Sequence, residues 1–281
     1  MPQPTRIAVL GAGNIGAALI GGILKGGVAA PEQVVATVHT KEKAAPLAER
    51  FGIRVLAAEN LMAVDGADVI ILAVKPARMA QMIEEIRWGL RDDRVLVSLA
   101  ASFPLNAIEG LMGRRLPMFR AMPNIPVLVE EGATCIAHNG AVETHHIQIV
   151  ERIFRAVGVV SWVEEEHLHA VTALSGSGPA YIYMVIEAMI AGGLKMGLSH
   201  EIATRLAEQT VLGAAKLVRE TGLHPAILKD QVITPGGVTI SAVHELEKHG
   251  LRSMLISAIE TATRHSRQMA QKVEEKLGHS A

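Results

Sequence analysis

Near the start of this 281-residue chain runs the stretch Ile7-Ala8-Val9-Leu10-Gly11-Ala12-Gly13-Asn14-Ile15-Gly16, a short apolar segment that ends in Gly-x-Gly-x-x-Gly. A helical pattern follows, and strand, glycine turn and helix in this order are typical of a dinucleotide-binding site. Gly11 allows a sharp turn, Gly13 a close approach of the pyrophosphate, and Gly16 tight packing of the helix on the sheet. Because the helix N-terminus adds free N–H groups, the stretch predicts a nucleotide-cofactor site rather than a plain strand–helix turn.

Composition narrows the class of protein. Apolar residues make up 49% of the chain but aromatic residues only 3%, so the core is expected to be aliphatic. A formal net charge of -1 without a dominant charged run makes nucleic acid and membrane poor partners. The longest apolar stretch, 180–194, is interrupted by Glu187 and is too short to span a bilayer. The single cysteine, Cys135, is expected in the core and suits a reducing compartment; with no signal peptide expected, the prediction is a cytoplasmic protein.

In the first half, strand-like and helix-like segments alternate. Apolar runs such as 69–74 are typical of parallel strands that are covered on both faces. The predicted strands are 6–10, 34–38, 53–56, 68–74, 94–99, 117–122, 133–137 and 159–162, and the predicted helices are 14–25, 41–51, 76–90, 105–111 and 143–157. This alternation predicts an α/β fold with a Rossmann-type doubly wound sheet, assigned to residues 1–163 as a cofactor-binding domain.

Residues 164–281 lack strand signals and predict an all-α domain. Its expected helices are 164–174, 179–196, 200–220, 225–230, 237–249 and 251–277. The segment Pro179–Leu194 is apolar almost all round, which indicates burial on every side. A second subunit would cover it, so a homodimer or higher homo-oligomer is expected. The alternative is a monomeric bundle with this helix at its centre.

The end of the second predicted strand bears on the choice of cofactor. An NAD site usually has an acidic residue there, about 20 residues past the glycines, whereas this chain has His39, Thr40 and Lys41, with no carboxylate before Glu42. Polar and cationic groups suit a 2′-phosphate, so NADPH is favoured, with NADH as the alternative. The usual arginine is missing, and these residues also fit a simple helix start.

Other strand ends on the same edge carry candidate site residues. The fourth strand runs into Ala73, Val74, Lys75 and Pro76, where Lys75 contacts either the cofactor or only the crevice rim. The fifth strand ends in the small residues Ser98–Ser102, and the sixth in Arg120–Asn124. Small and rigid groups at neighbouring strand ends predict a nicotinamide pocket.

A second chemical signal is the turn at Thr234-Pro235-Gly236-Gly237-Val238-Thr239. Adjacent glycines before a helix expose consecutive N–H groups, which can bind a carboxylate, and two threonine hydroxyls flank them. The same pattern also fits an ordinary helix N-terminus with Thr239 in its first turn.

Several motifs in order closely resemble those of pyrroline-5-carboxylate reductase. They are 230–239 continuing to His244-Glu245-Leu246-Glu247, together with 73–76, 122–124 and 174–181. The resemblance implies reduction of 1-pyrroline-5-carboxylate to proline with NADPH or NADH, and a helical domain interlocked with a second subunit. It implies cofactor contacts at Gly11, Ala12, Gly13, Asn14, Ile15, Gly16, Asn60, Ala73, Val74, Lys75, Pro76, Leu99, Ala100 and Ala101. It implies a substrate site at the Pro235–Thr239 turn, with Glu165 nearby, that is completed across the dimer. Residues 164–281 are therefore expected to be the dimerisation and substrate domain.

The chemistry expected of such an enzyme needs a hydride and one proton. Positioning and electrostatics suffice for a protonated imine, so neither a metal site nor a nucleophile is expected. The N–H groups near Gly236, Gly237, Val238 and Thr239 are expected to bind the substrate carboxylate, with Thr234 beside them and the Thr239 hydroxyl on the ring nitrogen. Two alternatives remain: a related imine or 3-hydroxyacid oxidoreductase, and a non-catalytic nucleotide-sensing protein.

Overall fold

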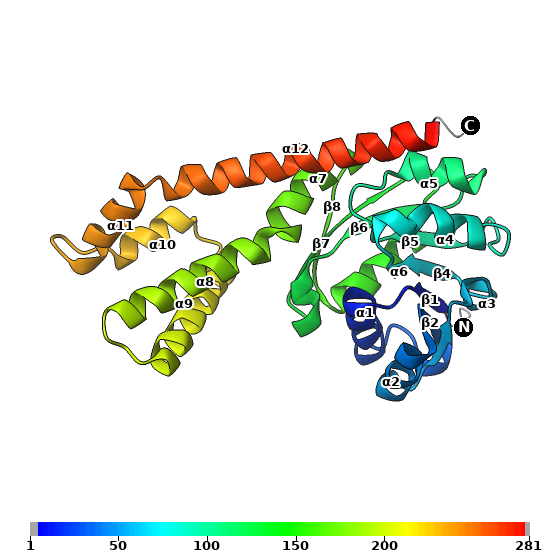
Figure 1. Cartoon of the computed structure of the whole chain (residues 1–281), viewed down its shortest axis with the longest axis horizontal. Coiled ribbons are helices and arrows are strands. Elements are labelled where there is room, and N and C mark those ends of the chain that lie inside the picture. Colours follow the sequence, from blue (N-terminus) through cyan, green and yellow to red (C-terminus); the bar gives the residue numbers. More distant parts are fainter. Residues whose placement is uncertain (1–4, 279–281) are drawn as a thin grey trace. The chain divides into compact units, whose positions relative to one another are not determined.

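The computed structural model describes residues 5–278, which fall into two compact units. Among the described residues, one unit consists of 5–177 together with 261–278, and the other is Gly178–Glu260 (Figure 1). The first unit continues past residue 163 because Leu168 and Ala173, in the segment that follows the last strand, are fully buried in it. The division of function between residues 1–163 and 164–281 stays a prediction.

Eight strands of the first unit form one sheet, in the order β3-β2-β1-β4-β5-β6-β7-β8. They are β1 Ile7–Leu10, β2 Val34–Val38, β3 Arg54–Ala57, β4 Val69–Leu72, β5 Val95–Ser98, β6 Met118–Met122, β7 Gly132–His138 and β8 Gly158–Trp162. All neighbouring pairs are parallel except β6 and β7. Because β1 pairs with β2 on one side and β4 on the other, the chain winds in both directions from β1. The predicted doubly wound α/β fold is therefore confirmed.

Helices cover both faces of this sheet (Figure 1). They are α1 Asn14–Lys25, α2 Lys41–Phe51, α3 Asn60–Val64, α4 Met79–Ile86, α5 Leu105–Met112, α6 Thr144–Arg155 and α7 Leu168–Val171, with 3₁₀ turns η1 Pro31–Gln33, η2 Pro76–Arg78, η3 Ile125–Val129 and η4 Glu165–His167 and a π-helical turn η5 Thr172–Gly176. Alternate residues of each strand enter opposite cores, Ile7 and Val9 facing α1 and α6, and Ala8 and Leu10 facing α3, α4 and α5. Both faces are thus apolar, which explains the continuous hydrophobic runs.

Element boundaries differ from the sequence prediction where the chain leaves the sheet. The predicted strand 68–74 is shortened to β4, because Ala73 and Val74 turn away to pack over the glycine turn. The predicted helix 76–90 is η2 followed by α4, which Arg87 caps. The short helix α3 was not predicted, since five residues carry too little periodicity.

The second unit contains the helices α8 Gly178–Lys195, α9 His200–Thr221, α10 Pro225–Val232 and α11 Val238–Lys248, and the first turns of α12 Leu251–Gly278. No residue of α8 is buried, and Tyr183 and Met184 are 58% and 68% exposed. The alternative of a monomeric bundle with α8 at its centre is therefore wrong. Over residues 5–278, no helix has the length and apolar character needed to cross a membrane.

Candidate active site

The glycine turn lies at the carboxyl end of β1, in the middle of the sheet. Gly11 has a φ of +77°, and a Cβ there would lie 2.4 Å from Val74 Cγ1. A Cβ on Gly16 would come within 3.3 Å of both Val9 and Ala73, whereas one on Gly13 would meet nothing closer than Gly11 O at 4.0 Å. The turn is thus filled on the sheet side and open at Gly13, the position where α1 begins without a side-chain cap.

A chain of hydrogen bonds that passes through the buried side chains of Thr37 and Asn60 supports the turn. The Gly11 N–H donates to Thr37 Oγ1 over 3.0 Å, and the Thr37 hydroxyl donates to Asn60 Oδ1 over 2.7 Å. The Asn60 amide nitrogen then donates to both carboxylate oxygens of Glu85, at 3.1 and 3.0 Å. Thr37 and Asn60 are 1% and 8% exposed, so the hydrogen bond between them is shielded from water, whereas Glu85 is exposed. Both ends of the Asn60 amide therefore have partners within the protein.

The end of β2 is exposed and lacks a carboxylate. His39 follows the strand, Thr40 is the residue before α2, and Lys41 is its first residue. The His39 ring meets an unexpected neighbour: Arg78 Nη1 lies 3.2 Å from His39 Nδ1. Arg78 was not predicted as a site residue, because its only signal in the sequence is its place three residues after the Ala73–Lys75 segment.

The remaining predicted cofactor residues lie at the ends of β4 and β5. Ala73 is tied to β1 by an N–H bond to Leu10 O at 2.9 Å, and Leu99 to β4 by one to Leu72 O at 3.0 Å. Beyond Leu99, Ala100 is buried and Ala101 half-buried. The structure thus brings together the glycine turn and the carboxyl ends of β2, β4 and β5, on the same side of the sheet.

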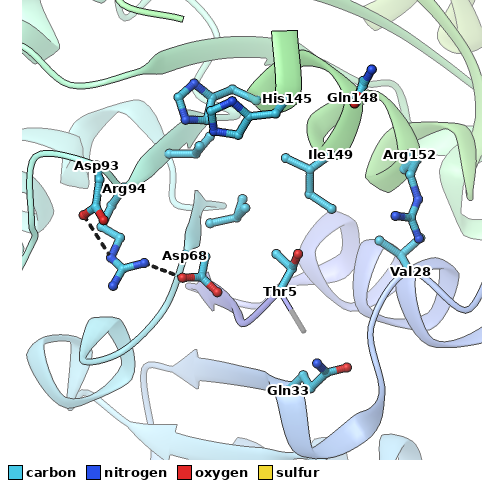
Figure 2. A pocket seen from close by; sticks show the side chains of 13 residues that line it. Thr5, Val28, Gln33, Asp68, Asp93, Arg94, His145, Gln148, Ile149 and Arg152 are labelled. Carbon is cyan, nitrogen blue, oxygen red and sulfur yellow. Dashed lines mark hydrogen bonds and ion pairs between the residues drawn. The ribbon is translucent and has the colours of Figure 1, made fainter. Parts of the chain in front are cut away.

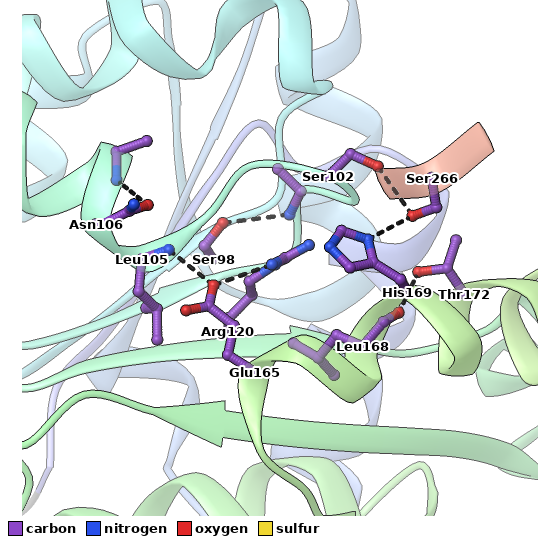
Figure 3. Close-up of polar contacts among 12 residues, drawn as sticks. Ser98, Ser102, Leu105, Asn106, Arg120, Glu165, Leu168, His169, Thr172 and Ser266 are labelled. Atoms are coloured by element: carbon purple, nitrogen blue, oxygen red, sulfur yellow. Dashed lines mark hydrogen bonds and ion pairs between the residues drawn. The ribbon is translucent and has the colours of Figure 1, made fainter. Parts of the chain in front are cut away.

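Glu165 lies in the first unit, and its carboxylate is hydrogen-bonded within that unit (Figure 3). Its Oε1 accepts hydrogen bonds from the Leu105 N–H at 2.8 Å and from Arg120 Nη1 at 3.0 Å. Arg120, on β6, is 3% exposed, so this ion pair fixes the segment after β8 on the sheet. The predicted contact of Glu165 with substrate stays a prediction.

Beside this ion pair, His169 of α7 is joined to α12. His169 Nδ1 lies 2.9 Å from Ser266 Oγ, which is 3.2 Å from Ser102 Oγ (Figure 3). Burial lowers the pKa of His169 below its usual range, and the charges of Arg120 and Arg267 lower that pKa further. The ring is therefore neutral at neutral pH.

The predicted substrate turn belongs to the second unit. Gly237 N–H donates to Thr234 O at 3.0 Å, with Pro235 and Gly236, whose φ is +68°, between them. These are the features of a type II β-turn, which needs glycine at its third position. No side chain caps α11, so the N–H groups of its first turn, including Val238 and Thr239, point out of the helix end without a helical partner.

A cavity of about 630 Å³ lies elsewhere, at the opposite edge of the sheet (Figure 2). It is lined by Thr5, His145 and Arg152 and by the ion pair of Arg94 with Asp68. Ligands of parallel sheets bind at the carboxyl ends of the strands, and this cavity faces the amino ends, so it is not the candidate site.

Within residues 5–278, no cluster of three or more His, Cys, Asp or Glu side chains is arranged to hold a metal ion. The Cys135 thiol is half-buried, and burial raises its pKa above the usual range, so it is a poor nucleophile.

Residues 165–269 match the family described as pyrroline-5-carboxylate reductase dimerisation, and residues 6–102 match NADP oxidoreductase, coenzyme F420-dependent. A pyrroline-5-carboxylate reductase of Arabidopsis thaliana is 38% identical over 266 residues, which is 95% of this chain and 96% of the relative. The chain belongs to the pyrroline-5-carboxylate reductase family.

Solved structures of this family have the same fold. A pyrroline-5-carboxylate reductase from Coxiella burnetii superposes with a TM-score of 0.90 at 34% identity, covering 95% of this chain and 99% of that one. The Plasmodium falciparum enzyme, solved with NADP bound, superposes with a TM-score of 0.86 at 28% identity, covering 96% of this chain and 99% of that one. Both superpositions cover the sheet as well as the helical unit.

Proposed function

We propose that this protein is an NAD(P)H-dependent oxidoreductase that reduces 1-pyrroline-5-carboxylate to L-proline, the last step of proline biosynthesis. The observation that carries the proposal is 38% identity to a pyrroline-5-carboxylate reductase over nearly the whole of both chains. NADPH is the expected hydride donor and NADH the alternative. The family match to a dimerisation region supports a homodimer or higher homo-oligomer.

The glycine turn is suited to bind the pyrophosphate of the cofactor. Gly13 leaves the backbone open to a phosphate, and the first turn of α1 offers N–H groups without a side-chain cap. Residues from Gly11 to Gly16, 39–41, Asn60, 73–76 and 99–101 are the proposed contacts. When bound there, the cofactor supplies the hydride, and the protein's task is to hold the nicotinamide at the strand ends.

The turn before α11 is suited to bind the substrate, a cyclic imine that carries a carboxylate. The free N–H groups of Val238 and Thr239 at a helix N-terminus favour a carboxylate. We assign the ring nitrogen to the Thr239 hydroxyl and place Thr234, Gly236 and Gly237 around the substrate, with Glu165 nearby. A protonated imine brings its own proton, so Thr239 acts by positioning the reacting carbon and by stabilising charge.

The exposed apolar surface of α8 supports contact with a second subunit. Tyr183 and Met184 lie on a helix without buried residues, an arrangement that is costly in water unless another surface covers it. We infer that two copies pair through this unit and that pairing completes the substrate site. We also propose a cytoplasmic location, supported by the single cysteine of the sequence.

The runner-up is an oxidoreductase acting on a 3-hydroxyacid or another imine. A lysine base on the first helix of the second unit would favour it, but the only lysine of α8 is its last residue, Lys195. NADPH oxidation with 1-pyrroline-5-carboxylate, compared with NADP reduction by 3-hydroxyisobutyrate, tests the choice. Turnover of the first alone supports the proposal, and turnover of the second alone contradicts it.

Thr239 provides the sharper test of the site. Thr239→Ala is expected to lower kcat/KM roughly ten- to a thousandfold, from one lost polar contact up to a lost transition-state donor. Thr239→Ser should keep most activity because it keeps the hydroxyl. Thr144, the exposed first residue of α6, offers a matched control: Thr144→Ala alters a helix start without touching the site. Near-normal kcat/KM in Thr239→Ala would refute the role.

A further inference from the structure

The β2 end presents no group that selects NADH. An acidic residue there would accept a hydrogen bond from the ribose 2′-hydroxyl, but the nearest carboxylate along the chain, Glu42, is in the first turn of α2. Its own backbone N–H and the Thr40 side chain donate to it, and these bonds lower the pKa of Glu42. This carboxylate therefore belongs to the first turn of α2 and not to the end of β2.

An arginine of η2, Arg78, lies at the end of β2, where an NAD site has its acidic residue. Arg78 ends η2, which follows β4, and its Nη1 lies 3.2 Å from Nδ1 of His39, directly after β2. Strands β2 and β4 are the two neighbours of β1, so the pair joins the ends of the strands on either side of the glycine turn. Two residues 39 positions apart in sequence therefore meet beside the predicted cofactor site.

The chemistry of this pair suits a phosphate. Arginine only donates hydrogen bonds, so a hydrogen bond over this distance uses the His39 tautomer in which Nδ1 accepts. The guanidinium has five N–H groups and uses one on His39, so enough remain for a bidentate contact with phosphate. Over residues 5–278, Arg78 forms no ion pair with a carboxylate and its only side-chain hydrogen bond is to His39. Its side chain is exposed and its charge is not neutralised.

We propose that Arg78 binds the 2′-phosphate of NADPH and thereby sets the preference of this enzyme for NADPH over NADH. His39 is the positioning residue that holds the guanidinium at the end of β2. Arg78 thus replaces, from the β4 side, the arginine that the segment after β2 lacks. The inference rests on the proposed function, because it names how that cofactor site distinguishes its two cofactors.

Binding of cofactor fragments tests this without turnover. The full-length protein is titrated with 2′,5′-ADP, which carries the 2′-phosphate, and with 5′-AMP, which lacks it, by isothermal calorimetry. Arg78→Met keeps much of the apolar stem and removes the charge, so it should weaken 2′,5′-ADP roughly ten- to a hundredfold and leave 5′-AMP within about twofold. Arg78→Lys should restore part of the loss, because it keeps a charge but not the planar fork.

One variant is a matched control, and a second variant tests the competing cation. Arg152→Met removes an exposed arginine from α6, which borders the cavity at the opposite sheet edge, and should change neither titration. Lys41→Met removes the other cation at the β2 end, which is itself a proposed cofactor contact, and should change the ratio of 2′,5′-ADP to 5′-AMP affinity by a smaller factor than Arg78→Met does. The proposal would be overturned if Lys41→Met shifted the ratio of 2′,5′-ADP to 5′-AMP affinity while Arg78→Met did not. It would also be overturned if Arg78→Met weakened the binding of both ligands equally.

A double-mutant cycle tests the role of His39. His39→Ala should weaken 2′,5′-ADP by a smaller factor than Arg78→Met, and this factor should vanish in the Arg78→Met background. An equal effect of His39→Ala in both backgrounds would show that the ring does not act through Arg78.

Cofactor ratios in steady state separate this inference from the proposed function. If 1-pyrroline-5-carboxylate is reduced but Arg78→Met leaves the NADPH-to-NADH ratio of kcat/KM unchanged, the inference fails and the function stands. If the imine is not reduced with either cofactor while 2′,5′-ADP affinity still depends on Arg78, the function fails and the phosphate contact stands.

Discussion

Replacing Gly13 or Gly11 of the glycine turn by alanine is expected to have different effects. The first change should weaken cofactor binding, and the second should lower the stability of the fold. At Gly13 the φ of -82° is open to any residue, and the added methyl group would meet no atom within about a van der Waals contact, the closest being Gly11 O at 4.0 Å. Gly13→Ala should therefore leave the free energy of unfolding unchanged or raise it by about 0.4–1 kcal/mol, since alanine restricts the unfolded chain. The methyl group would stand where the pyrophosphate approaches, so NADPH affinity should fall tenfold or more, about 1.4 kcal/mol.

Gly11→Ala should instead weaken the fold. Its φ of +77° is a left-handed conformation that costs alanine about 1–2 kcal/mol. The new Cβ would also lie 2.4 Å from Val74 Cγ1, and such overpacking costs about 1–3 kcal/mol. The expected loss is about 2–5 kcal/mol of unfolding free energy. Gly52→Ala is the matched control, because Gly52 has a φ of +64° with no atom within 4 Å, so only the backbone cost applies.

Urea unfolding and NADPH fluorescence titration of the three variants measure the two effects separately. Unfolding should rank the variants with Gly13→Ala the most stable, Gly52→Ala next and Gly11→Ala the least. NADPH affinity should fall in Gly13→Ala and remain that of the wild type in Gly52→Ala. A Gly13→Ala protein that bound NADPH normally would refute the assignment of its open side to the pyrophosphate, and one that lost several kcal/mol would refute the reading of its surroundings.

Three further outcomes are expected. Thr37→Val should cost about 2 kcal/mol or more in urea unfolding, because it leaves the Gly11 N–H and Asn60 Oδ1 buried without their shared partner; a loss below about 0.5 kcal/mol would contradict the network. The free energy of unfolding should fall as pH drops below about 6.5, because His169 takes up a proton in the unfolded chain but not in the folded one, where burial chiefly lowers its pKa. His169→Gln should flatten this part of a profile of melting temperature against pH. An unchanged slope would refute the prediction. Light scattering of the purified protein should show at least a dimer, since α8 exposes Tyr183 and Met184, and an active monomer would exclude the paired arrangement.

Much of the fold was open to sequence analysis because it follows from local patterns. Buried parallel strands read as apolar runs, and the predicted helices 14–25 and 41–51 agree with α1 and α2 at both ends. The errors lie where tertiary contacts override the pattern. Ala73 and Val74 are apolar enough to continue β4, but they pack over Gly11 instead. The five-residue helix α3 is held by its contacts, not by periodicity.

Some residues of the candidate site could also be predicted from local sequence, and others could not. The glycine turn and the Pro235–Gly237 turn are recognisable because their residues are consecutive. Each turn also contains a glycine with a positive φ, Gly11 in the first and Gly236 in the second. Arg78 and His39 belong to separate segments that meet only because β2 and β4 flank β1, which no local pattern reveals. Glu165 was expected from the resemblance, but its ion pair with Arg120 depends on packing between β6 and the segment after β8.

Asn60 shows why a resemblance and a contact need separate tests. The resemblance implies that Asn60 binds the cofactor, yet its amide oxygen accepts from Thr37 and its nitrogen donates to Glu85, and Thr37 in turn holds the Gly11 N–H. Replacing Asn60 would leave the buried Thr37 hydroxyl on β2 without its acceptor and loosen the turn that is proposed to bind the pyrophosphate. Cofactor affinity would then fall whether or not Asn60 touches the nucleotide. A direct contact is therefore established only if the loss in affinity exceeds the loss produced by Thr37→Val, which disturbs the same chain of hydrogen bonds from its other end.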